Sequence, residues 1–437
     1  MVGGNDTGGR SMPSGVPSID EVLTVLEDRS VGLNAITVTT EDRARTLAAR
    51  SADRVAAGKP SRPLEGVAVA VKDVIDIERY PTSMGSAVDT GRGELTTAPV
   101  VTALEEAGAL TVAKTNCQEF SYGILGEESV FGPVVNPRGA DLCTAGSSSG
   151  STALVAAGAV PLAVGTDTAG SVRIPAACTG TIGFKPTFGL VPVYGVFPLA
   201  HSCDTVGFFA LDIDLIRQAF LTTRIEGGCP VAVAGVGVPP GRSAHSDGSA
   251  RRILTAGDDS AAGRLLASVI DESLRLYEVL RKYEAYQVHR EFLETQGDRY
   301  QPVVRQRALL GEDITTAQYE EARAGQTALR ESALRLFDDA DVIRTPAMEV
   351  AVPTWAEVGS EHRDAFTRYS TPFNVLGWPA ITVPVAGDAV DADGALTTTG
   401  GAGVEKAGTL PESVQFAAAP GEDLELLAFA EEFLRGA

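Results

Sequence analysis

Short, strongly apolar segments alternate with segments of helical periodicity along much of this sequence. The run LEGVAVAVKDVID (64–76) is rich in β-branched residues and ends in charged ones, which is typical of a buried strand. Apolar residues at helical spacing follow in APVVTALEEAGA (98–109), and LTVAKTN (110–116) returns to strand character. This alternation predicts an α/β protein with a mixed central β-sheet covered by helices on both faces.

A long helical stretch interrupts this alternation in the second half of the chain. Residues 262–338 have helical periodicity, and the strand-like segments DVIRTP (341–346) and PAITVPVAG (379–387) follow them. Because strand-like segments flank the stretch on both sides, we expect a single domain over residues 18–437 with a helical insertion at about 262–338. Residues 1–17 are polar and Gly-rich, and we expect a flexible N-terminal arm there.

Charge and cysteine content narrow the classes of partner. The 437 residues carry a formal net charge of −21 and contain no run of Lys or Arg, so we expect no nucleic-acid or anionic-membrane partner. No apolar segment approaches the about 18 residues that a membrane span needs. The five cysteines form no CxxC pair and no apolar leader is visible, which predicts reduced thiols and a cytoplasmic location. The four histidines lack metal-ligand spacing, so we expect no metal site.

Two Gly/Ser-rich loops, AGSSSGS (145–151) and GTDTAGS (165–171), allow several interpretations. A phosphate-binding loop would need Lys after its second glycine, but Ser171 stands there. A flexible linker is disfavoured because the first loop runs directly into the apolar stretch TALVAAGAVPLAVG. A serine nucleophile would need a base and N–H donors for its oxyanion. One of the scattered histidines or Lys72, at the end of an apolar strand, could be that base, and the residues alone leave the choice open.

Four stretches, taken together, resemble the amidase signature family of serine hydrolases. They fall densely between residues 60 and 210, and as an ordered set they are far more specific than either loop alone. The stretches are PLEGVAVAVKDVID (63–76), AKTNCQEFSYG (113–123), GPVVNPRGADLCTAGSSSGS (132–151) and AVGTDTAGSVRIPAACTGTIGFKPTFGLVP (163–192), with weaker echoes at 202–210, 370–384 and 410–415.

The resemblance implies a catalytic trio and a reaction. Ser171 falls on the nucleophile of the family signature, Ser147 on its bridging serine with a cis peptide, and Lys72 on its base. Neutral Lys72 would accept a proton from Ser147, which would deprotonate Ser171 as it attacks a carboxamide. An acyl-enzyme would form on Ser171, and hydrolysis would yield a carboxylate with ammonia or an amine. The resemblance implies no metal or organic cofactor, a small-molecule amide as substrate, and a protein that acts alone or as a homodimer.

The resemblance also implies the position of an oxyanion hole. The backbone N–H groups of Thr168, Ala169, Gly170 and Ser171 would converge on the carbonyl oxygen of the tetrahedral intermediate. Ala169 stands where the family pattern has Gly, which allows a small difference in loop shape because Ala disfavours positive φ.

Further residues are expected around the trio. Asp167 is expected to brace the loop through backbone hydrogen bonds. Arg173 is expected to clamp the loop from behind, and contact with an acidic group of the substrate is its alternative role. Tyr122, Cys178 and His201 are candidates for the substrate pocket. Cys178 lies where relatives often carry an aromatic or aliphatic residue, so the pocket floor is expected to differ.

Two other activities of the same fold remain open. An allophanate- or ureido-type hydrolase would bind an anionic substrate through Arg or Tyr, for which Tyr122, Arg305 and Arg307 are candidates. A glutamine-hydrolysing subunit of a tRNA-dependent amidotransferase is disfavoured by the acidic charge. A catalytically inactive relative has little support, because Lys72, Ser147 and Ser171 are all present.

Overall fold

A single mixed sheet runs through the protein. The computed structural model describes residues 18–92, 96–225, 251–385, 388–390, 396–398 and 413–436. Within them, ten strands form one sheet in the order β1-β3-β2-β4-β6-β5-β9-β12-β8-β7. The strands are β1 (Ile36–Thr39), β2 (Ala68–Lys72), β3 (Leu110–Thr115), β4 (Leu162–Asp167), β5 (Ile182–Lys185), β6 (Thr205–Ala210), β7 (Ile253–Thr255), β8 (Val342–Pro346), β9 (Ala380–Pro384) and β12 (Ser413–Ala417); β10 (Asp388–Val390) pairs with β11 (Leu396–Thr398) separately. The expected arm, residues 1–17, lies outside the described residues.

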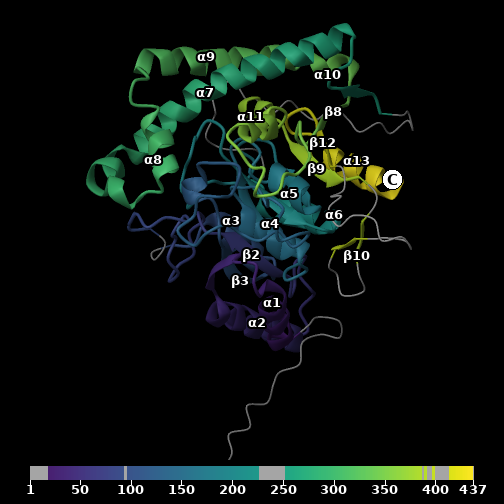
Figure 1. The fold of residues 1–437 in the computed structure, drawn as a ribbon. Coiled ribbons are helices and arrows are strands. Elements are labelled where there is room, and N and C mark those ends of the chain that lie inside the picture. Colours follow the sequence, from purple (N-terminus) through teal and green to yellow (C-terminus); the bar gives the residue numbers. More distant parts are fainter. Residues whose placement is uncertain are drawn as a thin grey trace, which may run out of the picture.

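The two faces of the sheet bury different side chains of the same strand. In β2, Val69 and Val71 belong to an apolar cluster that includes helices α3 (Pro99–Glu106) and α6 (Ile213–Thr223). Ala68 and Ala70 point the other way, into a cluster with helices α1 (Ile19–Ser30), α2 (Glu41–Ala56) and α4 (Ser149–Ala156). This alternation is the period of two that a strand covered on both sides requires. The predicted α/β class, with helices on both faces of a mixed sheet, is therefore confirmed (Figure 1).

The helices vary widely in length, from one turn to 36 residues. Among the described helices, none is both long and apolar enough to cross a membrane. The helices are α1 (Ile19–Ser30), α2 (Glu41–Ala56), α3 (Pro99–Glu106), α4 (Ser149–Ala156), α5 (Arg173–Thr179), α6 (Ile213–Thr223), α7 (Ala261–Gln296), α8 (Pro302–Leu309), α9 (Thr316–Ala333), α10 (Leu336–Asp339), α11 (Glu361–Thr367), α12 (Thr371–Val375) and α13 (Asp423–Gly436), with 3₁₀ turns η1 (Glu119–Ser121) and η2 (Gly297–Arg299).

The helical stretch predicted at 262–338 is α7 to α10, which connects the edge strand β7 with its parallel neighbour β8. Helices α7 and α9 lie side by side beyond the sheet, at the top of Figure 1. Tyr283 of α7 stacks on Tyr319 of α9, with ring centroids 4.3 Å apart. Tyr277 of α7 packs in a buried cluster with Ala169, so the insertion reaches the loop that carries Ser171.

The order of the central strands brings two sequence motifs to one sheet edge. Strands β2 and β4 are parallel neighbours, with Val71 paired to Val164. Their carboxyl ends, Lys72 and Asp167, therefore lie at the same edge of the sheet. In open α/β sheets this edge is where ligands bind.

Candidate active site

Lys72 is the last residue of β2 and is fully buried. Its Nζ donates hydrogen bonds to Oγ of Ser147, at 2.6 Å, and to Oγ1 of Thr166, at 2.8 Å. Burial lowers the pKa of Lys72 to about 8, although the charges of Asp167 and Asp204 oppose the shift. A lysine with this pKa exists in both protonation states close to neutral pH, so it can accept and return a proton.

Ser147 precedes α4 and is fixed by its backbone. The peptide between Gly146 and Ser147 is cis, as the family resemblance implied. The Gly146 N–H donates to the carbonyl of Ile124 at 2.7 Å, and the Ser147 carbonyl accepts from the N–H of Gln118 at 3.1 Å. These bonds hold the Ser147 hydroxyl against Lys72, at the carboxyl ends of β2 and β4.

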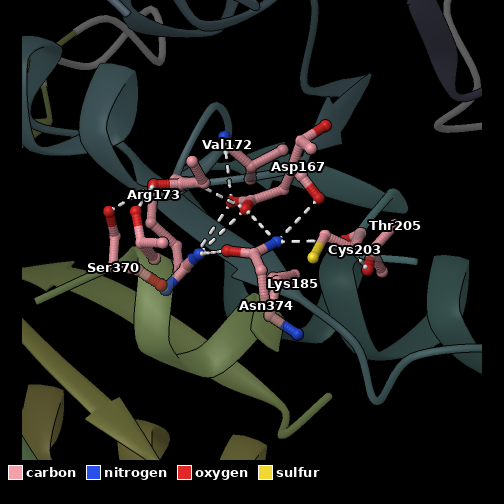
Figure 2. A network of polar contacts seen from close by, with 12 residues as sticks. Asp167, Val172, Arg173, Lys185, Cys203, Thr205, Ser370 and Asn374 are labelled. Atoms are coloured by element: carbon pink, nitrogen blue, oxygen red, sulfur yellow. Dashed lines mark hydrogen bonds and ion pairs between the residues drawn. The ribbon is translucent and has the colours of Figure 1, made fainter. Parts of the chain in front are cut away.

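The loop between β4 and α5 carries Ser171 and is organised around Asp167 (Figure 2). The Asp167 carboxylate accepts from the N–H groups of Gly170, at 2.8 Å, and Val172, at 3.1 Å. It also pairs with Arg173 at 2.8 Å. The guanidinium of Arg173 outweighs burial and lowers the pKa of Asp167 to about 2, so the carboxylate stays ionised at neutral pH. A permanently ionised group braces the loop and does not transfer protons.

Arg173 is fully engaged behind the loop. A guanidinium has five N–H donors. Nε and Nη2 donate to the two oxygens of Asp167, Nη2 also donates to Asn374, and Nη1 donates to the Ser370 carbonyl and to Gln415. The side chain is 1% exposed. All five donors are therefore used, which leaves none for a substrate.

Ser171 stands on the wall of a cavity of about 640 Å³, together with Thr168 and Ala169. Its hydroxyl has no hydrogen-bond partner among the described residues. Gly170 has φ of +124°, and its N–H is engaged by Asp167. Of the four N–H groups expected in the oxyanion hole, the Gly170 N–H is thus directed at the carboxylate, and those of Thr168, Ala169 and Ser171 remain candidates.

The remaining predicted pocket residues divide into two groups. Tyr122 and Arg307 line the cavity. Cys178 and His201 are not among its lining residues, contrary to expectation. Cys178 is buried in an apolar cluster with its Sγ 3.8 Å from the sulfur of Met348, because α5 turns this position away from the loop.

The other two residues that fall outside the cavity lie on the surface. His201 is 66% exposed and faces Glu284, at 3.4 Å. Arg305, a candidate for an anionic substrate, is exposed on α8. Neither sequence position carries a signal that distinguishes a pocket residue from a surface one. The conformation of the surrounding loop or helix decides whether the side chain faces the cavity or the solvent.

Several residues that support the site lie in the stretches that resemble the family, but the sequence analysis did not single them out. Thr166 is the second partner of Lys72. Asp204 accepts a hydrogen bond from the Thr168 hydroxyl at 2.6 Å. Ser370 donates to the Ala169 carbonyl at 2.5 Å, and Asn374 donates to the Asp167 carbonyl at 2.8 Å. The last two come from the segment around α12, some two hundred positions away, so only the tertiary structure could reveal their contacts with the Ser171 loop.

Other chemistry finds little support among the described residues. They contain no group of three or more His, Cys, Asp or Glu placed to hold a metal ion. Burial raises the pKa of Cys117, the cysteine next to Lys72, to about 12, so this thiol is protonated and a poor nucleophile at neutral pH.

The amino-acid sequence matches the family model described as Amidase over residues 20–226 and 262–427. The chain is 31% identical over 404 residues to the AtzE subunit of the 1-carboxybiuret hydrolase of Pseudomonas sp. (strain ADP), which covers 84% of this chain and 86% of that protein. It is 31% identical over 385 residues to the 2-amino-5-chloromuconic acid deaminase of Comamonas testosteroni, with 82% of each chain covered. It is 30% identical over 422 residues to the A subunit of the glutamyl-tRNA(Gln) amidotransferase of Symbiobacterium thermophilum. That match covers 84% of this chain and 83% of the other protein.

Solved structures share the whole architecture. A crystal structure of an amidase superposes with a TM-score of 0.76 and 27% identity, covering 98% of this chain and 96% of the other. An inhibitor-bound complex of an s-triazine catabolic enzyme superposes with a TM-score of 0.79 and 26% identity, again covering 98% and 96%.

Proposed function

This chain belongs to the amidase family, and we propose that it is a serine amidase that hydrolyses a small-molecule carboxamide to a carboxylate and ammonia or an amine. The observation that carries the proposal is the buried Lys72, whose Nζ lies 2.6 Å from the Ser147 hydroxyl. Family relatives act on C–N bonds, among them a 2-amino-5-chloromuconic acid deaminase and the AtzE subunit of a 1-carboxybiuret hydrolase.

In the proposed first step, Ser171 attacks the amide carbonyl. Its proton passes to Ser147 as the Ser147 proton passes to Lys72. A tetrahedral intermediate forms, and the N–H groups of Thr168, Ala169 and Ser171 receive its oxyanion. Loss of one such donor typically costs about 3–4 kcal/mol of transition-state stabilisation.

In the second step the same groups work in reverse. An amide resists hydrolysis because its nitrogen leaves poorly unless it is protonated, so the base must become an acid. The Lys72 ammonium returns the proton through Ser147 to the departing nitrogen. The acyl group then remains on Ser171. Water, deprotonated by the same relay, attacks the acyl-enzyme and releases the carboxylate, which regenerates the Ser171 hydroxyl.

The other activities of the family are distinguished by substrate. Glutamyl-tRNA(Gln) amidotransferases contribute several of the relatives, so glutamine belongs in any assay. Three predictions from the sequence analysis remain predictions: that the substrate is a small molecule, that the protein acts alone or as a homodimer, and that it is cytoplasmic.

The test is ammonia release from a panel of primary amides by wild type, Ser171→Ala and Lys72→Met. The panel comprises aliphatic, aromatic, carboxylate-bearing and ureido amides together with glutamine. Wild type should release ammonia from at least one amide, and both variants should lose at least about a thousandfold in kcat. Substantial turnover by folded Ser171→Ala would overturn the assignment, and so would the absence of ammonia release by wild type from every member.

A further inference from the structure

The cavity in front of Ser171 carries more positive than negative side chains in its lining, whereas the protein as a whole is strongly acidic. The protein has a formal net charge of −21, with 57 acidic and 36 basic residues. The lining contains five arginines and three carboxylates: Arg275, Arg281, Arg307, Arg363, Arg368, Glu278, Glu349 and Asp364. Local charge reversal in an acidic protein favours anionic ligands, because field lines concentrate in a concave site.

Arg307 is held in place on the wall formed by residues 121–124. Its Nη1 donates to the Tyr122 carbonyl at 2.8 Å, and the Tyr122 hydroxyl donates to the Arg307 carbonyl at 3.0 Å. The Arg307 side chain is 11% exposed. Its nearest carboxylate is Glu128, at 3.4 Å, which is not among the residues lining the cavity. The counter-charge thus lies behind the guanidinium, not between it and the cavity.

Arg281 of α7 packs over the ring of the same tyrosine. Its Cζ lies 5.5 Å from the ring centroids of both Tyr122 and Tyr277. Its hydrogen bonding is incomplete: Nη2 donates to Glu278 at 2.7 Å, whereas the buried Nε has no partner among the described residues. The two cation–π contacts hold the guanidinium beside Tyr122. Nη1 has no hydrogen-bond partner among the described residues, so its donors are available to an anion in the cavity.

The other three arginines also pair with acidic side chains, but they lie farther toward solvent than Arg281 and Arg307. Arg275 is 66% exposed and bonds Glu272, and Arg363 bonds Glu127 at 2.8 Å. Arg368 is 39% exposed and bonds both Asp271 and Glu349, each at 3.1 Å. The most enclosed cations are therefore Arg281 and Arg307. Two cations packed on one tyrosine repel each other, and an anion received by both would relieve that repulsion.

We propose that the substrate is an amide with a carboxylate at its other end, and that Arg281 and Arg307 receive this carboxylate while Ser171 attacks the amide. A guanidinium matches the geometry of a carboxylate through parallel N–H donors, which selects an anionic substrate over a neutral one of the same shape. The inference rests on the proposed amidase function and specifies the substrate class of that site. Both arginines are thus specificity residues, and the roles of the catalytic trio are unchanged.

The test compares pairs of amides that differ only in charge. Succinamate and glutaramate are each paired with the neutral isostere in which an isopropyl group replaces the carboxylate. Ammonia release gives kcat and KM separately. Wild type should prefer one of the two anionic amides over its isostere by about tenfold to a hundredfold in kcat/KM, the usual range for a hydrogen bond to a charged group.

Variants then locate the preference. Arg281→Met and Arg307→Met should each reduce the preference about tenfold or more, mainly by raising KM for the anionic amide. Arg290→Met removes the same charge from an exposed position of α7 outside the cavity lining, and should retain the preference. The Arg281 side chain is 17% exposed and the Arg307 side chain is 11% exposed, so Arg281→Met is less disruptive to the fold. If Arg307→Met does not fold, Arg281→Met alone tests the carboxylate site.

The outcomes separate the two proposals. If wild type hydrolyses the neutral isosteres as well as the anionic amides, or if the preference survives in folded Arg281→Met, the carboxylate site is refuted and the amidase function stands. If wild type releases ammonia from no amide of any charge, the proposed function itself fails.

Discussion

Nζ of Lys72 lies 2.6 Å from Oγ of Ser147, at the point where two parallel neighbouring strands end. The amine is fully buried, and burial lowers its pKa to about 8. Lys72 can therefore accept a proton from the Ser147 hydroxyl, a role that a histidine fills in many serine hydrolases. The expected behaviour of the enzyme follows from this contact and from the loop beside it.

The first prediction concerns pH. Lys72 accepts a proton only when neutral, so kcat/KM for a neutral amide should rise with pH and level off above a midpoint near 8, the pKa of Lys72. Below the midpoint the rate should fall about tenfold per pH unit. Steady-state kinetics with an uncharged amide check this. A profile that is flat from about pH 6 to 10 would exclude a titrating base of this kind.

The second prediction concerns Thr166, which accepts a hydrogen bond from Lys72 at 2.8 Å. Thr166→Val keeps the shape of the side chain but removes an acceptor that stabilises the ammonium form. The pKa of Lys72 should fall further, and the kcat/KM profile should move to lower pH by about one unit. A shift to higher pH, or none, would show that this contact does not favour the protonated amine.

The third prediction concerns Asp167, the centre of the network in Figure 2. Asp167→Asn leaves the Arg173 guanidinium buried without its counter-ion. Breaking one side of a buried pair typically costs about 3–5 kcal/mol in the free energy of unfolding. Equilibrium urea unfolding measures this cost. Asp42→Asn, at an exposed position of α2, should change stability by less than about 0.5 kcal/mol, and an equally small effect at Asp167 would contradict the bracing role.

The fourth prediction concerns Gly170. At φ of +124° a side chain is strained, and a Cβ there would lie 2.3 Å from Oγ of Ser370. Gly170→Ala should displace the backbone beside Ser171 and reduce kcat by at least about a hundredfold, the usual cost of losing one oxyanion donor. Gly58→Ala is the control, because Gly58 also has positive φ but a Cβ there would meet nothing within 4 Å. Equal kcat values for the two variants would argue against a role for the loop's shape.

Local sequence identified the strand that ends at Lys72 and the loops that carry Ser147 and Ser171, because apolar runs and small residues are local signals. It could not show that Ser370 and Asn374 brace the Ser171 loop, since their contacts depend on how α12 packs. Cys178 and His201 were expected in the pocket on position alone, and the orientation of α5 and the loop after β5 places them elsewhere. The arginine lining of the cavity comes from α7, α8 and α11, whose packing over the site no local pattern encodes.

The central claim is that Ser171 is the nucleophile. A small aryl phosphonofluoridate, which reacts with activated serine hydroxyls, tests it by mass spectrometry. Ser147 and Ser171 share one tryptic peptide, residues 139–173, so fragment ions must locate the adduct within it. We predict one adduct per chain, on Ser171, that is absent from Ser171→Ala and strongly slowed in Lys72→Met. An adduct on Ser147 or any other residue of the wild-type protein, or an adduct that persists in folded Ser171→Ala, would contradict the claim.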